Sequence, residues 1–87
     1  MNTRYTEVLT IVMQIFTDLR SAPEQFHPFR TIQLRAGSDY SLHNGTEIAQ
    51  VINTAIADGL FMFKEGGPAG MGYVALTDKG YQSRNMN

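Results

Sequence analysis

The sequence predicts a single α+β domain spanning residues 1–87, and three features of the chain lead to that prediction. Apolar residues recur at three- and four-residue spacing over the first 21 positions, which indicates an amphipathic helix. The segment 44–58 combines a helix cap with an apolar face and a polar face. Two short runs rich in aromatic and β-branched residues then flank a glycine-rich loop, which is typical of a β-hairpin.

The first helix is expected over Thr3–Ser21, and Pro23 ends it because the proline ring clashes with the preceding turn. Its apolar positions are Tyr5, Val8, Leu9, Val12, Ile15, Phe16 and Leu19. At about 100° per residue, Ile11 and Met13 widen the apolar arc to roughly 200°, which is broader than one core requires. Two interpretations stay open: the domain wraps around this helix, or Ile11, Met13 and Ile15 form the contact of a homodimer.

The segment 24–43 fits two periodic patterns. Ile32, Leu34 and Ala36 alternate as in a strand, whereas Phe29, Ile32 and Ala36 stand at helical spacing. We favour the strand because the segment contains adjacent β-branched residues.

The predicted strand covers Arg30–Arg35, and the polar residues after it form a turn. A short helix over Asp39–His43 is then expected before the next long helix. Both elements depend on the choice between the two patterns.

The clearest helix of the chain is predicted from Asn44 to Asp58. Asn44 can cap it, and Glu47 stands three residues later, as in a capping box. Gly59 can adopt the left-handed conformation that ends a helix, with Leu60 folding back on the last turn. Around the helix axis the apolar residues occupy one side. The other side carries Thr46, Gln50, Asn53, Thr54 and Ala57.

A β-hairpin is predicted from the runs Leu60–Glu65 and Gly72–Thr77 around the loop Gly66–Met71. Thr77 can cap a last short helix, which Gly80 weakens because glycine is a poor helix former. Aromatic side chains can stack on nucleic-acid bases, but in a chain this small they are favoured as core residues. The aromatic residues concerned are Phe26, Phe29, Phe61, Phe63 and Tyr73.

The order of these elements resembles the winged helix-turn-helix superfamily. One segment that carries the resemblance is Thr46–Leu60, which is similar to a recognition helix and the Asp-Gly-Leu leading into the wing. The other is Tyr73–Gly80, which is similar to the y-x-L-T-x-K-G that closes the wing in many small bacterial regulators of the MarR and PadR kind. The family usually places a helix of two to three turns between Phe29 and Asn44, where the pattern here favours a strand.

The resemblance implies a winged helix-turn-helix fold with a long N-terminal helix, a capped third helix and a C-terminal hairpin as the wing. It also implies a small bacterial or phage transcriptional regulator, acting as a homodimer that reads duplex DNA with helix 46–58. In that role Gln50 and Asn53 would pair with adenine edges. Thr46 and Thr54 would contact phosphates or thymine methyl groups. Phosphate contacts would also come from Lys64 and Arg35.

The charge of the chain supports an alternative function. Seven Lys and Arg residues against eight Asp and Glu residues give a net charge of −1, so a strong nucleic-acid footprint is absent overall. No Lys or Arg stands on helix 46–58, and Glu47 and Asp58 flank its polar face. The alternative is a winged-helix module that works by contact with a protein partner, through the first helix or the Met-containing wing.

No catalytic, metal or cofactor site is expected. His27 and His43 stand 16 positions apart without any cysteine, which does not fit a zinc site. The glycine-rich loop lacks the Lys-Ser/Thr ending of a phosphate-binding loop, and no G-x-S-x-G nucleophile motif occurs. Polar residues interrupt the first apolar segment, so we expect no membrane span, and a cysteine-free chain fits the cytoplasm.

Overall fold

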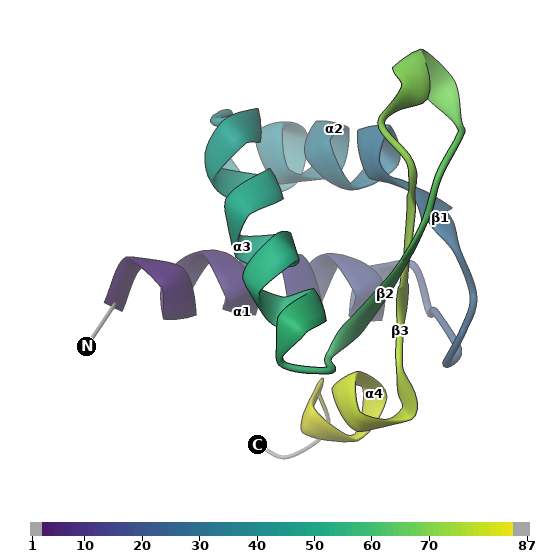
Figure 1. Cartoon of the computed structure of the whole chain (residues 1–87). Helices are drawn as coiled ribbons and strands as arrows, with labels where there is room; N and C mark the ends of the chain where they lie inside the picture. The colour runs from purple at the N-terminus through teal and green to yellow at the C-terminus, as the bar shows by residue number, and fades with distance from the viewer. Residues whose placement is uncertain (1–2, 85–87) are drawn as a thin grey trace.

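The computed structural model describes residues 3–84 and confirms the α+β class. Within these residues, four α-helices lie beside a small antiparallel sheet at one edge of the domain (Figure 1). The elements are α1 (Thr3–Asp18), β1 (His27–Pro28), α2 (Phe29–Tyr40), α3 (Gly45–Ala57), β2 (Phe61–Lys64), the short 3-10 helix η1 (Pro68–Gly70), β3 (Tyr73–Leu76) and α4 (Asp78–Arg84). None of the helices in this part of the chain is both long enough and apolar enough to span a membrane.

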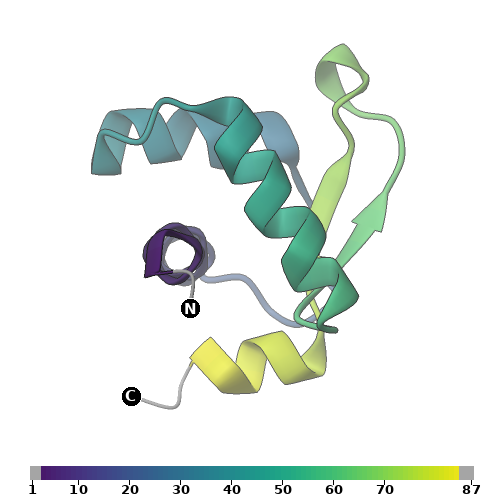
Figure 2. The same ribbon diagram turned by 60° about the vertical axis from the view of Figure 1, so that its left-hand side comes forward.

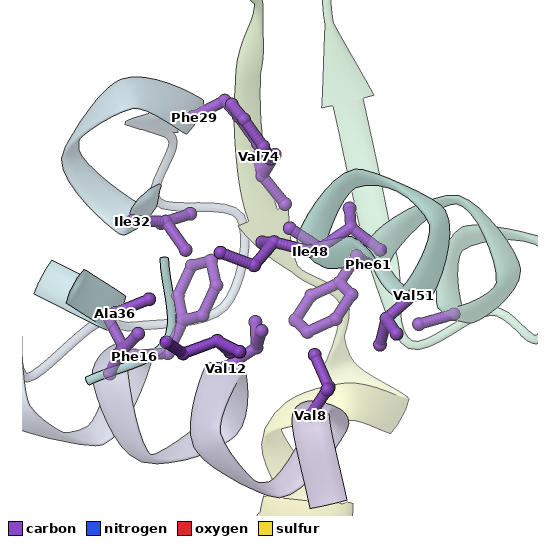
Figure 3. Packing of buried hydrophobic residues seen from close by; sticks show 14 of the residues in the cluster. Val8, Val12, Phe16, Phe29, Ile32, Ala36, Ile48, Val51, Phe61 and Val74 are labelled. Atoms are coloured by element: carbon purple, nitrogen blue, oxygen red, sulfur yellow. The ribbon is translucent and has the colours of Figure 1, made fainter. Parts of the chain in front are cut away.

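Helix α1 packs against α2 and α3, and α4 lies on its other side (Figure 2). The ring of Phe16 stacks on Phe61 of β2, with 5.3 Å between the ring centroids. Side chains from α1, α2, α3 and both hairpin strands converge on this cluster (Figure 3). Ile15 is fully buried in the same core, so its predicted place at a dimer contact is wrong: the chain's own packing leaves it no exposed surface. Ile11 and Met13 are only partly buried against the core.

The sheet has the strand order β1-β3-β2, with both pairs antiparallel. The hairpin predicted between residues 60 and 77 is confirmed, with Phe61 opposite Leu76 and Lys64 opposite Tyr73. Strand β1 was not predicted, because its two residues are too few to show a periodic pattern.

The predicted strand Arg30–Arg35 is wrong, because Phe29–Tyr40 forms the continuous helix α2. This helix buries Phe29, Ile32 and Ala36, the set at helical spacing, and leaves Leu34 60% exposed. The segment therefore adopts the pattern whose apolar side chains the rest of the molecule can bury.

The predicted short helix Asp39–His43 is also wrong. Helix α2 continues through Tyr40, and Ser41 then adopts a left-handed conformation with φ 57°. The N–H of Leu42 donates to the carbonyl of Ala36 at 2.9 Å, which ends the helix and turns Leu42 into the core. Residues 41–44 are the whole connection between α2 and α3.

The caps predicted for α3 are confirmed at both ends. Asn44 Oδ1 accepts a hydrogen bond from the N–H of Glu47 at 3.1 Å. Gly59 has φ 81°, and its N–H donates to the carbonyl of Ile56 at 3.0 Å. The N–H of Leu60 donates to Ala55 at 2.9 Å, which completes a Schellman motif. The carboxylate of Glu47 does not reach back to Asn44 as a capping box requires, because Arg4 binds it instead.

Residues 58–60 and 77–80, two segments far apart in the sequence, hold each other in the structure. The hydroxyl of Thr77 lies 2.5 Å from the carbonyl oxygen of Gly59 and accepts the N–H of Gly80 at 3.0 Å, so it caps α4, as predicted. Lys79 Nζ donates to the carbonyl of Asp58 at 2.9 Å. These contacts join the start of α4 to the end of α3, which gives both segments a structural role.

Candidate functional site

The outward side of α3 is an exposed polar strip, formed by Thr46, Gln50 and Asn53, which we call the α3 stripe. Helix α3 buries Ile48, Val51, Ile52 and Ala55, and the stripe lies on the opposite side of the helix axis. Thr54 is exposed at the edge of the stripe, where its hydroxyl donates to the carbonyl of Gln50 at 3.1 Å. The predicted division of α3 into an apolar and a polar face is thus confirmed.

A bidentate ion pair lies beside the stripe on the side of α1. Arg4 Nε and Nη2 donate to the two carboxylate oxygens of Glu47 at 2.7 and 2.9 Å. These hydrogen bonds lower the pKa of Glu47 and raise the pKa of Arg4. A shallow groove of about 240 Å³ lies here, and its lining includes Gln50 and Thr54. The negative charge of Glu47, beside the stripe, is therefore paired with Arg4.

An apolar groove lies on the other side of α3, between α3 and the β2–β3 hairpin, and we call it the hairpin groove. Its volume is about 340 Å³. The lining residues are Phe29, Ala49, Ile52, Asn53, Phe63, Met71 and Val74. Asn53 carries the polar side chain of this lining. The hairpin groove therefore adjoins the α3 stripe at that residue.

Phe63 is the exposed aromatic wall of the hairpin groove. Its side chain is 49% exposed, although the sequence favoured it as a core residue. The prediction holds for Phe29 and Phe61, which are buried, while Phe26 and Tyr73 are partly buried. A Cβ at Gly72 would overlap the ring of Phe63, so glycine at position 72 is what lets this ring lie against the backbone.

Lys64 and Arg35, predicted as phosphate contacts, lie outside the α3 stripe. The side chain of Lys64 is on the opposite face of the sheet from Phe63, since successive residues of a strand alternate. Its Nζ lies 4.7 Å from the ring centroid of Phe26 and 4.9 Å from that of Tyr73. The residues around Lys64 therefore differ from those around the α3 stripe.

Arg35 lies on the flank of α2 that faces the end of α1. Its guanidinium is 3.8 Å from the carboxylate of Asp39. The pKa of Asp18 is lowered, mainly by hydrogen bonds from Tyr40 and Gln14 and further by the charge of Arg35. Arg35 thus faces two acidic side chains, Asp39 and Asp18.

The cation on the α3 side of α2 is Arg30, which was not among the predicted phosphate contacts. It lines an open groove of about 580 Å³ together with Gln33 and His43. The amide of Gln33 lies against Gly45, the first residue of α3. No ion-pair partner for Arg30 is found within residues 3–84. If α2 had been predicted, helical spacing over residues 30–37 would have placed Arg30 and Gln33 on one face of that helix.

His27 takes part in the packing around the core. Within the described residues no group of three or more His, Cys, Asp or Glu side chains could hold a metal ion. His27 Nε2 shares a hydrogen bond of 2.5 Å with the buried hydroxyl of Ser21, and burial lowers the pKa of His27. Its ring packs edge-on against Phe16, so His27 is part of the packing around the core.

Comparisons with protein-family models, with curated proteins and with solved structures give no match to this chain.

Proposed function

We propose that this chain is a winged helix-turn-helix protein that binds duplex DNA, with α3 in the major groove and the β2–β3 hairpin as the wing. The succession α2, residues 41–44 and α3 supports this proposal, since it supplies two helices joined by a tight turn. Helix α2 also occupies the segment where the superfamily places a helix. The hairpin follows α3 directly, as a wing does.

The observation that carries the proposal is the α3 stripe. Its three side chains are exposed, polar and able to hydrogen-bond to base edges. No other helix or strand of the described chain covers the outer side of α3 (Figures 1 and 2). At about 1.5 Å per residue, a helix of this length spans roughly 20 Å, and the major groove of about 12 Å accepts an α-helix.

Phosphate contacts in this proposal come from α2 and the turn. Arg30 is exposed in the first turn of α2, beside Gln33 and His43, and no acidic residue neutralises it within the described residues. We therefore put Arg30 ahead of Arg35 as the cation that contacts the DNA backbone. The Arg4–Glu47 pair removes one repulsive charge next to the stripe.

The test is a binding series with bulk DNA and with duplexes selected from a random pool. Wild-type protein should be retained on heparin at low salt through counterion release. Asn53→Ala should weaken binding to a selected duplex by about 1–3 kcal/mol and leave non-specific binding unchanged. Arg30→Ala should weaken all duplexes and reduce the slope of log K against log salt by about 1, whereas the matched variant Arg35→Ala should not. Passage straight through heparin, together with no enriched duplex, would overturn the proposal.

The hairpin groove favours a second candidate function, contact with a protein partner. Half-exposed aromatic side chains in concave surroundings are typical anchor sites of protein interfaces. Phe63 and Met71 form such a site next to α3. Two results would favour this function. The chain would not bind heparin, and a bound partner would block surface labelling of Met71.

A further inference from the structure

We propose that the α3 stripe selects A·T base pairs, and that the hairpin groove receives the methyl group of the thymine paired with the adenine bound by Asn53. The inference rests on the proposed function and adds the class of duplex that the site recognises. It follows from three properties of the surface: which hydrogen-bonding groups are free, which are occupied, and where the apolar wall stands.

The free hydrogen-bonding groups of the stripe match adenine. Gln50 and Asn53 each offer an amide with one acceptor and two donors, and this pattern pairs bidentately with N7 and N6 of adenine. Guanine is read instead by the paired donors of Arg or Lys, and neither residue type stands between Gly45 and Ala57. Thr46 can contact either kind of base pair and does not oppose this preference.

The charged groups next to the α3 stripe that could read a G·C pair, Glu47 and Arg4, are occupied, and Arg30 on α2 is assigned above to the DNA backbone. Cytosine N4 is read by a carboxylate, and Glu47 is the carboxylate of α3. Both of its oxygens accept hydrogen bonds from Arg4, at 2.7 and 2.9 Å. The same ion pair occupies the guanidinium of Arg4, which also lies 3.8 Å from Glu7. Neither member of the pair is therefore free to reach guanine or cytosine.

The apolar wall stands where a thymine methyl group would project. The methyl group at C5 of thymine lies in the major groove on the same base pair as the adenine edge. Asn53 belongs to the lining of the hairpin groove, so a base bound by its amide lies at the mouth of that groove. Ala49 and Phe63 line the same space, and the absence of a side chain at Gly72 leaves room for the ring of Phe63. A methyl group enters apolar surroundings there without displacing a polar partner.

Selection from a random duplex pool is the first experiment. Base pairs whose preference disappears in Asn53→Ala or Gln50→Ala should be A·T pairs. Failure to enrich any duplex would contradict the proposed function itself. Enrichment of G·C at the positions sensitive to Asn53 would overturn this inference while DNA binding stands.

The second experiment replaces thymine by deoxyuridine at the selected site, which removes the methyl group and leaves wild-type protein unchanged. Affinity should fall about fourfold at one thymine, the effect expected for burying one carbon. Phe63→Ala should lose the discrimination between thymine and deoxyuridine. The matched control is Leu34→Ala, which removes the other large exposed apolar side chain, on α2, and should keep it. Equal affinity of wild-type protein for both duplexes would overturn the assignment of the hairpin groove.

Discussion

Replacing Gly80 with alanine should destabilise this protein, although alanine is the better helix former. Gly80 lies inside α4, where an ordinary exposed glycine-to-alanine change stabilises a helix by about 1 kcal/mol. Here Gly80 is buried against Leu60, which follows the end of α3. A Cβ at position 80 would overlap the carbonyl oxygen of Leu60, and it would lie 3.0 Å from the carbonyl carbon of Leu60 and 3.2 Å from Leu76 Cδ2.

The size of the effect follows from which atoms must move. Overpacking a filled site costs about 1–3 kcal/mol, and the upper half of that range applies because the overlapped atoms belong to the backbone. The carbonyl of Leu60 also accepts the N–H of Thr77 at 3.1 Å, so displacing it disturbs the contact between residues 58–60 and 77–80. After subtracting the helix-propensity gain, the free energy of unfolding should fall by about 1–2 kcal/mol.

Thermal unfolding followed by circular dichroism measures this directly. For a domain of this size each kcal/mol lowers the melting temperature by about 4–8 °C. The matched control is Ser83→Ala, an exposed position on the same helix, which should melt at or slightly above the wild-type temperature. If Gly80→Ala melts as high as wild type, the close approach of α4 to Leu60 is not what requires glycine.

Three further outcomes are expected. Gly59→Val should lower the free energy of unfolding by more than about 1 kcal/mol in a denaturant titration, because φ 81° resists a β-branched residue; an unchanged midpoint would contradict the strain. Hydrogen bonds from Arg4 lower the pKa of Glu47, so its contribution to stability is complete above the ordinary value of 4.5 and is lost as the pH falls through the lowered pKa. The melting temperature of Glu47→Gln should therefore depend less on pH in that acidic range than the wild type does, and parallel curves would argue against it. Sedimentation should show a homodimer at micromolar concentration that Ile11→Glu converts to a folded monomer, since Ile11 and Met13 flank the covered face of α1; a wild-type monomer at high concentration would remove that assignment.

Helix α3 and the hairpin could be predicted from the sequence because their signals are local. The Asn44 cap acts within three residues, and the Gly59 stop acts within the last turn and the residue after it. The polar side of α3 follows from helical periodicity alone. The α3 stripe is therefore a property of a short stretch of sequence, whatever surrounds it.

Helix α2 and strand β1 depended on the rest of the molecule. Residues 29–40 fit both a strand and a helix, and the helix forms because α1 and the rest of the core bury Phe29, Ile32 and Ala36 together. Strand β1 exists because His27 and Pro28 lie opposite Val74 and Tyr73. No local sequence pattern indicates the core that covers α2 or the strand that pairs with β1.

The electrostatic surroundings of the α3 stripe were also decided only by the tertiary structure. Glu47 has the spacing of a capping box, but Arg4, 43 residues earlier, offers it two charge-assisted hydrogen bonds, which are stronger than one bond to a neutral N–H. Strand alternation directs Lys64 to the far face of the sheet, and helical rotation of α2 turns Arg30 toward α3 and Arg35 toward Asp39. A linear sequence places a charge along the chain, whereas packing determines which other charges it faces.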